Sequence, residues 1–103
     1  IASPVWMDIS ESDTLQACRN ARENDDERHI TPTQLEVSEN FLTMYSNPND
    51  TVFSPFIGIG SEIYQAVKMG RKGLGFELKQ SYFDLAAKNC KSAADSLLQQ
   101  SLL

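Results

Sequence analysis

The stretch Thr51-Val-Phe-Ser-Pro-Phe-Ile-Gly-Ile-Gly-Ser61 decides how this chain folds. It opens with a short β-branched and aromatic run over residues 51–53, which is typical of a buried strand. Gly58 and Gly60 follow at once, where a tight turn would need a backbone free of side-chain clashes. The stretch therefore predicts a strand that leads into an open, glycine-containing turn.

A helix and a second strand are expected after this turn. Apolar side chains recur at helical spacing between residues 61 and 69, and Gly70 is placed to stop the helix. Residues 73–77 have the pattern of a second strand, and that strand ends in an acid, Glu77. Strand, glycine turn, helix, strand and acid make up the front half of a nucleotide-type binding unit.

The residue types of this unit suit a nucleoside-type ligand. The glycines allow close approach of the backbone, and the helix N-terminus after Gly60 offers free N–H groups to polar or anionic ligand atoms. Glu77 is placed to accept hydrogen bonds from ribose hydroxyls. However, Ile63 holds the third glycine position of the G-x-G-x-x-G fingerprint. An ordinary strand-turn-helix-strand with a surface Glu therefore stays open as the alternative.

Four segments resemble one known family. Ser54-Pro-Phe-Ile-Gly-Ile-Gly60 resembles the D-P-F-x-G-x-G motif of S-adenosylmethionine-dependent DNA amino-methyltransferases, the N-4/N-6 DNA methylases. Residues 70–82 are similar to that family's G-R-x-x-x-G-x-E-x-x-x-x-Y segment. Pro32-Thr-Gln34 resembles its H-P-T-Q-K-P segment, and Asn47-Pro-Asn-Asp50 resembles the N-P-G-D before its first strand. The resemblance covers roughly residues 29–95.

The chain departs from the family's pattern in three ways. Ser54 stands where the motif begins with Asp, and Leu35 stands where the family often has Lys. The 103 residues contain no D-P-P-Y-type catalytic motif, which the order of the other segments would place N-terminal to them. We therefore expect the C-terminal part of a larger enzyme, inactive by itself.

The resemblance implies methyl transfer from S-adenosylmethionine to an exocyclic amino group of adenine or cytosine in DNA. No catalytic residue and no metal ligand is assigned in this chain. The residues that the resemblance implies for cofactor binding are Thr33, Gln34, Pro55, Phe56, Gly58, Gly60, Ser61 and Glu77. For Thr33 and Gln34, a plain helix cap is an equal alternative, and for Phe56 the alternative is a core aromatic.

The predicted fold is an α/β fragment of a Rossmann-like methyltransferase fold, with two parallel strands and about three main helices. Residues 1–30 are expected to form a loop-rich segment, and residues 31–103 the S-adenosylmethionine-binding half of the domain. Strands are expected over about 51–54 and 73–77, joined by a right-handed helical crossover.

The two outer helices are predicted from caps and periodicity. Thr31, Pro32 and Gln34 read as the N-cap, first helical position and capping-box position of a helix to about Ser46. Ser81 is expected to start the last helix, with Asp84 as a weaker capping-box partner. An apolar stripe should face the core along that helix, formed by Phe83, Ala86, Ala87, Cys90, Ala93, Ala94, Leu97 and Leu98.

Charge and composition bound the partners. The net charge is −5, with ten acids and three bases in residues 1–50 but four acids and six bases in residues 51–103. The acidic first half repels phosphate, so contacts to DNA are expected from the missing part of the parent protein. Cys18 and Cys90 read as reduced thiols of a cytoplasmic protein, and no apolar run is long enough to span a membrane.

Two other classes of function stay open. The first is a non-enzymatic interaction module, such as a degenerate methyltransferase remnant, which the absent catalytic motif favours. The second is another nucleotide-binding unit, for example one that uses a nicotinamide cofactor. A sheet of two strands has two open edges, so we expect it to pair with the missing N-terminal half or with a second copy of this chain.

Overall fold

The structure is a computed structural model that describes residues 5–10, 12–15 and 33–102. Its elements, in chain order, are α1 (Leu35–Tyr45), β1 (Thr51–Ser54), α2 (Ser61–Lys68), β2 (Lys72–Gly75) and α3 (Gln80–Ser101). The strands β1 and β2 pair in parallel, and α2 is the crossover between them. Within the described ranges, the structure therefore confirms the predicted α/β class with two parallel strands and three helices.

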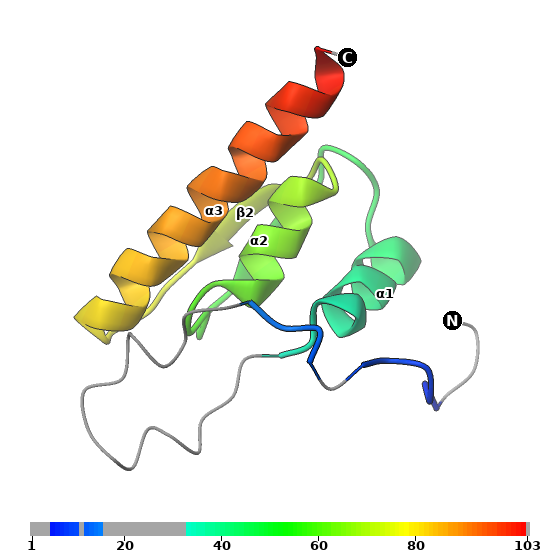
Figure 1. Ribbon diagram of the computed structural model, residues 1–103, viewed down its shortest axis with the longest axis horizontal. Coiled ribbons are helices and arrows are strands. Elements are labelled where there is room, and N and C mark those ends of the chain that lie inside the picture. The colour runs from blue at the N-terminus through cyan, green and yellow to red at the C-terminus, as the bar shows by residue number, and fades with distance from the viewer. Residues whose placement is uncertain (1–4, 11, 16–32, 103) are drawn as a thin grey trace.

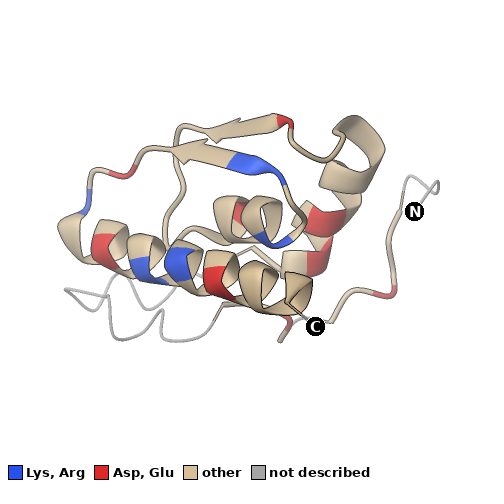
Figure 2. Cartoon of the chain, turned by 90° about the horizontal axis from the view of Figure 1, so that it is seen from above, with Lys and Arg blue, Asp and Glu red and all other residues tan. Residues whose placement is uncertain are grey.

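The helix α2 lies directly on one face of the sheet. A Cβ atom added at Gly73 would collide with the side chain of Ile63, and one added at Gly75 would collide with Ile57. These two glycines in β2 therefore let α2 and the preceding loop approach the sheet closely. In Figure 1, α2 lies between α1 and α3, and Figure 2 shows the strands on one side with the helices beneath them.

Small side chains form much of the contact between α2 and α3. Ala66, Ala86 and Ala93 are almost fully buried, so the two helices pack closely. Tyr82 packs with Ile59 at the start of α3, and Asn89 of α3 donates a hydrogen bond to the Ile59 carbonyl at 2.9 Å. The described core residues, all buried and apolar, are Leu42, Ile59, Ile63, Ala66, Tyr82, Ala86 and Ala93.

One arginine joins the ends of two helices. Arg71 follows α2, and its guanidinium donates to the Ser46 hydroxyl at 3.1 Å and to the Ser46 carbonyl at 3.0 Å, just past α1. It also donates to the Met69 carbonyl at 2.9 Å, next to the end of α2. Arg71 thus supplies a cation to carbonyl groups that helix ends leave unpaired.

The predicted start of α1 is wrong. The helix begins at Leu35, with Gln34 as its N-cap, and Gln34 makes no capping hydrogen bond with its side chain. The capping acceptors come instead from Asp13, whose carbonyl accepts from the Leu35 N–H at 2.7 Å and whose carboxylate accepts from the Glu36 N–H at 3.1 Å. A distant acid therefore does what the local pattern assigned to Thr31, which lies outside the described residues, as does Pro32.

The last helix begins one residue earlier than predicted, at Gln80 with Lys79 as its N-cap. Asp84 does not form a capping box; its carboxylate accepts from the Gln80 side chain at 2.8 Å. The buried face of α3 also differs from the predicted stripe: Phe83 and Leu98 are 47% and 62% exposed. The helix is rotated because Tyr82, which the stripe omitted, packs against Ile59.

Two other expectations concern the ends of the chain and membranes. Residues 5–10 and 12–15 contain no helix or strand, and the predicted boundary at residues 30 and 31 falls outside the described residues. In the part of the chain that is described, no helix combines the length and the apolar character that a membrane crossing requires.

Candidate functional site

The candidate site lies where the two parallel strands end. Backbone hydrogen bonds continue past both strands: the Phe76 N–H donates to the Ser54 carbonyl at 3.2 Å, and the Ile57 N–H donates to the Phe76 carbonyl at 3.1 Å. The loops after β1 and β2 are therefore held side by side at one edge of the sheet. In open α/β sheets, ligands bind outside the carboxyl ends of the strands.

The loop after β1 depends on its glycines. Gly58 and Gly60 have φ angles of 56° and 93°, a backbone region that side chains rarely allow. A Cβ atom added at Gly60 would lie 3.1 Å from the Cβ of Ala86 in α3. Gly60 is also the N-cap of α2, and its carbonyl accepts the first helical hydrogen bond, from Tyr64 at 2.7 Å. The predicted open turn is therefore confirmed.

Glu77 lies against this glycine loop. The Gly58 N–H donates to one oxygen of the Glu77 carboxylate at 3.1 Å, and the Lys79 N–H donates to the other oxygen at 3.4 Å. These bonds fix the half-buried carboxylate beside the loop, and each oxygen keeps a second lone pair for another donor. The structure thus brings Gly58 and Glu77, two of the predicted site residues, into direct contact.

The other predicted site residues are less closely gathered. Ser61 is buried as the first residue of α2, whereas Pro55 is exposed in the loop after β1. Phe56 is 83% exposed, so the alternative that it is a core aromatic is wrong. Thr33 and Gln34 lie just before α1, which leaves the predicted cofactor contacts of these residues as predictions.

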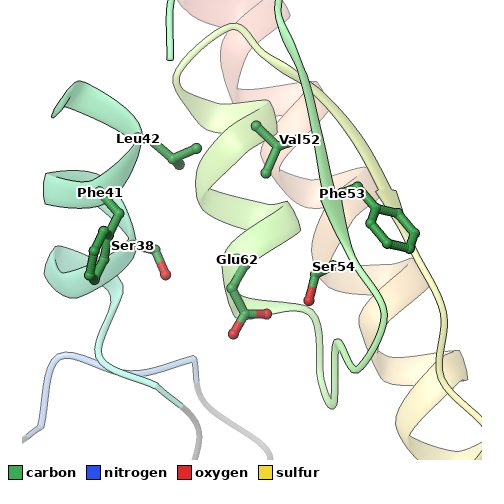
Figure 3. A pocket seen from close by; sticks show the side chains of 7 residues that line it. All are labelled: Ser38, Phe41, Leu42, Val52, Phe53, Ser54 and Glu62. Carbon is green, nitrogen blue, oxygen red and sulfur yellow. The ribbon is translucent and has the colours of Figure 1, made fainter. Parts of the chain in front are cut away.

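A pocket of about 260 Å³ opens between α1, β1 and α2. Its lining residues are Ser38, Phe41, Leu42, Val52, Phe53, Ser54 and Glu62. Figure 3 shows the oxygen atoms of Ser38, Ser54 and Glu62 together at one end of the pocket, and the side chains of Leu42 and Val52 toward the other end. The pocket therefore has a polar end beside the last residue of β1.

Glu62 is the ionisable residue of this lining. Burial raises the pKa of its carboxyl above the usual value of 4.5, and a hydrogen bond with its own backbone N–H partly opposes this rise. One carboxylate oxygen, Oε2, is buried and accepts no hydrogen bond from the described residues. The sequence analysis missed Glu62 and Ser38, and the available signal was the position of Glu62 directly after the glycine motif.

The strands, the crossover helix and the glycine loop define an α/β unit of the Rossmann type. Within this class the chain belongs to the DNA methylase family of N6/N4 methyltransferases, whose family model matches residues 3–88.

Curated relatives share part of their length with this chain. The type II methyltransferase M.BglII of Bacillus subtilis is 38% identical over 72 residues, which are 68% of this chain and 20% of that relative. The type II methyltransferase M1.MboII of Moraxella bovis is 36% identical over 58 residues, 56% of this chain and 22% of that relative. The chain thus spans about a fifth of the length of the curated relatives it matches.

Solved structures share the fold. The crystal structure of an M1.HpyAVI–SAM complex matches with a TM-score of 0.57 and 29% identity, over 66% of this chain and 33% of that one. A DNA modification methylase from Thermus thermophilus, complexed with S-adenosyl-L-methionine, matches with a TM-score of 0.55 and 29% identity, over 78% of this chain and 38% of that one. These likenesses confirm the predicted methyltransferase fold.

Proposed function

We propose that this chain is the cofactor-binding portion of a DNA methyltransferase that uses S-adenosylmethionine and modifies an exocyclic amino group of adenine or cytosine. The observation that carries the proposal is the hydrogen bond between the glycine loop and Glu77, at the carboxyl ends of two parallel strands. This geometry suits a nucleoside, and the family membership points to a methyl donor rather than another nucleotide.

The chain's residues would hold and orient the cofactor. Glu77 accepts hydrogen bonds from the ribose hydroxyls, while its contact with Gly58 keeps the carboxylate in place. The loop through Gly60 leaves room for the ligand backbone contacts, and the free N–H groups at the start of α2, from Ser61 on, face polar ligand atoms. Thr33, Gln34, Pro55 and Phe56 complete the proposed set.

When bound, S-adenosylmethionine supplies an electrophilic methyl group on a sulfonium. The amino nitrogen of the base forms the new bond to the methyl carbon, the sulfur–carbon bond breaks, and the nitrogen loses a proton. This chain contributes orientation of the donor, which lowers the entropic part of the barrier. The residues that hold the base and accept the proton belong to the part of the protein outside this chain, so the chain alone should not methylate DNA.

The rest of the same protein is the proposed partner of the open sheet face. Phe53, Leu74 and Phe76 point away from α2 and are each more than half exposed. Phe53 and Phe76 contact each other edge to face, with ring centroids 5.8 Å apart. An apolar face of this kind, on a chain that spans about a fifth of its relatives, fits a surface that the remaining sheet and helices cover. DNA contacts and a cytoplasmic location follow from the same proposal.

A non-enzymatic interaction module is the second candidate, and the same exposed sheet face favours it. A dinucleotide-binding unit is disfavoured by Ile63. This residue holds the third glycine position, is buried, and fills the space over Gly73 between α2 and the sheet. A third glycine there would leave a cavity in the core instead of a closer approach to a ligand.

A titration separates these candidates. S-adenosylhomocysteine and NADH are titrated calorimetrically into the full-length protein that carries this chain, into its Glu77→Ala variant, and into Glu39→Ala, a matched loss of an exposed carboxylate on α1. We expect S-adenosylhomocysteine alone to bind, Glu77→Ala to weaken it on the order of ten- to a hundredfold, and Glu39→Ala to leave it unchanged. Binding of NADH alone, or equal binding by Glu77→Ala, would contradict the proposal.

A further inference from the structure

The carboxylate of Glu62 is in a position that its own helix does not explain. An acidic residue in the first turn of a helix is ordinarily stabilised by the helix dipole while it stays in water. Glu62 instead turns into the pocket between α1, β1 and α2, where its Oε2 atom is buried without a hydrogen-bond donor among the described residues. A buried carboxylate oxygen without a donor costs free energy, which a ligand that donates would recover.

The surroundings of Glu62 select the kind of ligand. The hydroxyls of Ser38 and Ser54 lie at the same end of the pocket and can accept hydrogen bonds as well as donate them. No other residue of the lining is ionisable, so the pocket carries a single negative charge without a counter-ion from the lining. Such an end suits a small cation with several N–H donors, such as a primary ammonium group.

The position of Ser54 adds an independent observation. The motif that this segment resembles begins with Asp, and here that position is a serine at the end of β1. Both Ser54 and Glu62 line the same pocket. The negative charge absent from the strand end is therefore present across the pocket, at the start of α2.

We propose that this pocket receives the α-ammonium group of the cofactor's methionine portion, with Glu62 as its counter-ion and Ser38 and Ser54 as further hydrogen-bond acceptors. The inference rests on the proposed function, because it assigns the amino-acid end of the same cofactor. With the ribose at Glu77 and the glycine loop between them, the amino-acid end would extend past the start of α2 to Glu62, which follows Ser61 directly.

The test compares two ligands that differ at this end. S-adenosylhomocysteine carries the α-ammonium and no sulfonium, and 5′-methylthioadenosine carries the nucleoside without the amino-acid portion. Both are titrated into the full-length protein, its Glu62→Gln variant, and Glu39→Gln as the matched control. We expect Glu62→Gln to weaken S-adenosylhomocysteine on the order of ten- to a hundredfold and to leave methylthioadenosine unchanged.

A second variant tests whether the charge itself matters. Ser54→Asp combined with Glu62→Gln returns a carboxylate to the pocket from the other side, and it should regain most of the lost affinity for S-adenosylhomocysteine. Methylthioadenosine binding also reports that each variant is folded.

Three results would overturn the inference: equal affinity of wild type and Glu62→Gln for S-adenosylhomocysteine, an equal loss for both ligands, or no recovery in the double variant. If the wild type binds neither ligand, the proposed function fails with it, and that result is distinct from the other three.

Discussion

Glu62 also makes stability depend on pH, because folding moves its carboxyl out of water. The folded-state pKa lies above the usual value of 4.5, so between these two values the folded state binds more protons than the unfolded state. The free energy of unfolding contributed by this group is therefore largest below pH 4.5 and falls as pH rises through the folded-state pKa.

We predict that Glu62→Gln lowers this pH dependence. Denaturant unfolding of the wild type and of Glu62→Gln, measured at several pH values from 4 upward, should show a steeper fall in stability for the wild type. Glu39→Gln, which removes an exposed carboxylate, should follow the wild type. Parallel curves for the wild type and Glu62→Gln would show that Glu62 stays solvated.

Gly60 is the second residue with a specific physical requirement. Its φ of 93° and its distance to Ala86 both oppose a side chain. Gly60→Ala should lower the free energy of unfolding by about 1–3 kcal/mol, because the new Cβ meets the α3 backbone in addition to the strain in φ.

Gly58→Ala is the matched control, since a Cβ there has nothing within 4 Å and meets only the strain of a φ of 56°. Thermal unfolding should therefore rank Gly60→Ala as the more harmful of the two. An equal loss in both variants would mean that contact with Ala86 is unimportant.

The sequence allowed the glycines and Glu77 to be predicted, because residue type and spacing alone restrict such loops. The contact between Gly58 and Glu77 joins residues 19 positions apart and required the pairing of the strands. Glu62 was missed for a similar reason: only the packing of α1 beside α2 closes a pocket around it. An acid in a first helical turn ordinarily points to water, so its local sequence gave no warning.

At the scale of elements, the strands and the crossover helix follow directly from local pattern. β1 was predicted at its observed position, and Gly70, with a φ of 83°, follows the end of α2 as expected. The ends of α1 and α3 differ because their partners come from elsewhere in the chain. Asp13 supplies the cap of α1, and the packing of Tyr82 on Ile59 sets the rotation of α3.

The cap from Asp13 gives a prediction for α1. Asp13→Ala removes the carboxylate that accepts from the Glu36 N–H, so it should lower the free energy of unfolding by about 0.5–2 kcal/mol. Asp8→Ala, in the same N-terminal segment and exposed, is the control and should change stability little. Urea unfolding of both variants measures the difference; equal midpoints would mean that this segment does not cap α1.

At the scale of the whole molecule, the three helices lie on one side of a two-stranded sheet, and the other side is apolar and exposed among the described residues. The strand pattern predicted a small sheet with open edges. It did not predict which face the helices leave uncovered, because Gly73 and Gly75, which face α2, carry no side chain that would show a buried face.

We predict that the uncovered face is buried in the full-length protein. Leu74→Lys should then lower its free energy of unfolding by more than about 2 kcal/mol, because a charge would be buried without a partner. Leu98→Lys, on the exposed side of α3, should have an effect within about 0.5 kcal/mol. If a second copy covers the face instead, Leu74→Lys would dissociate a dimer in sedimentation measurements.

Hydrogen exchange with and without S-adenosylhomocysteine, followed by mass spectrometry on the full-length protein, tests the central claim most directly. A cofactor at the proposed site should slow exchange in the peptides that span residues 54–62 and 76–79, around the glycine loop, Glu62 and Glu77. The last turns of α3, residues 94–101, should exchange at the same rate in both states. Unchanged exchange in the glycine loop, or protection only elsewhere in the protein, would contradict the assignment of this chain as the cofactor-binding portion.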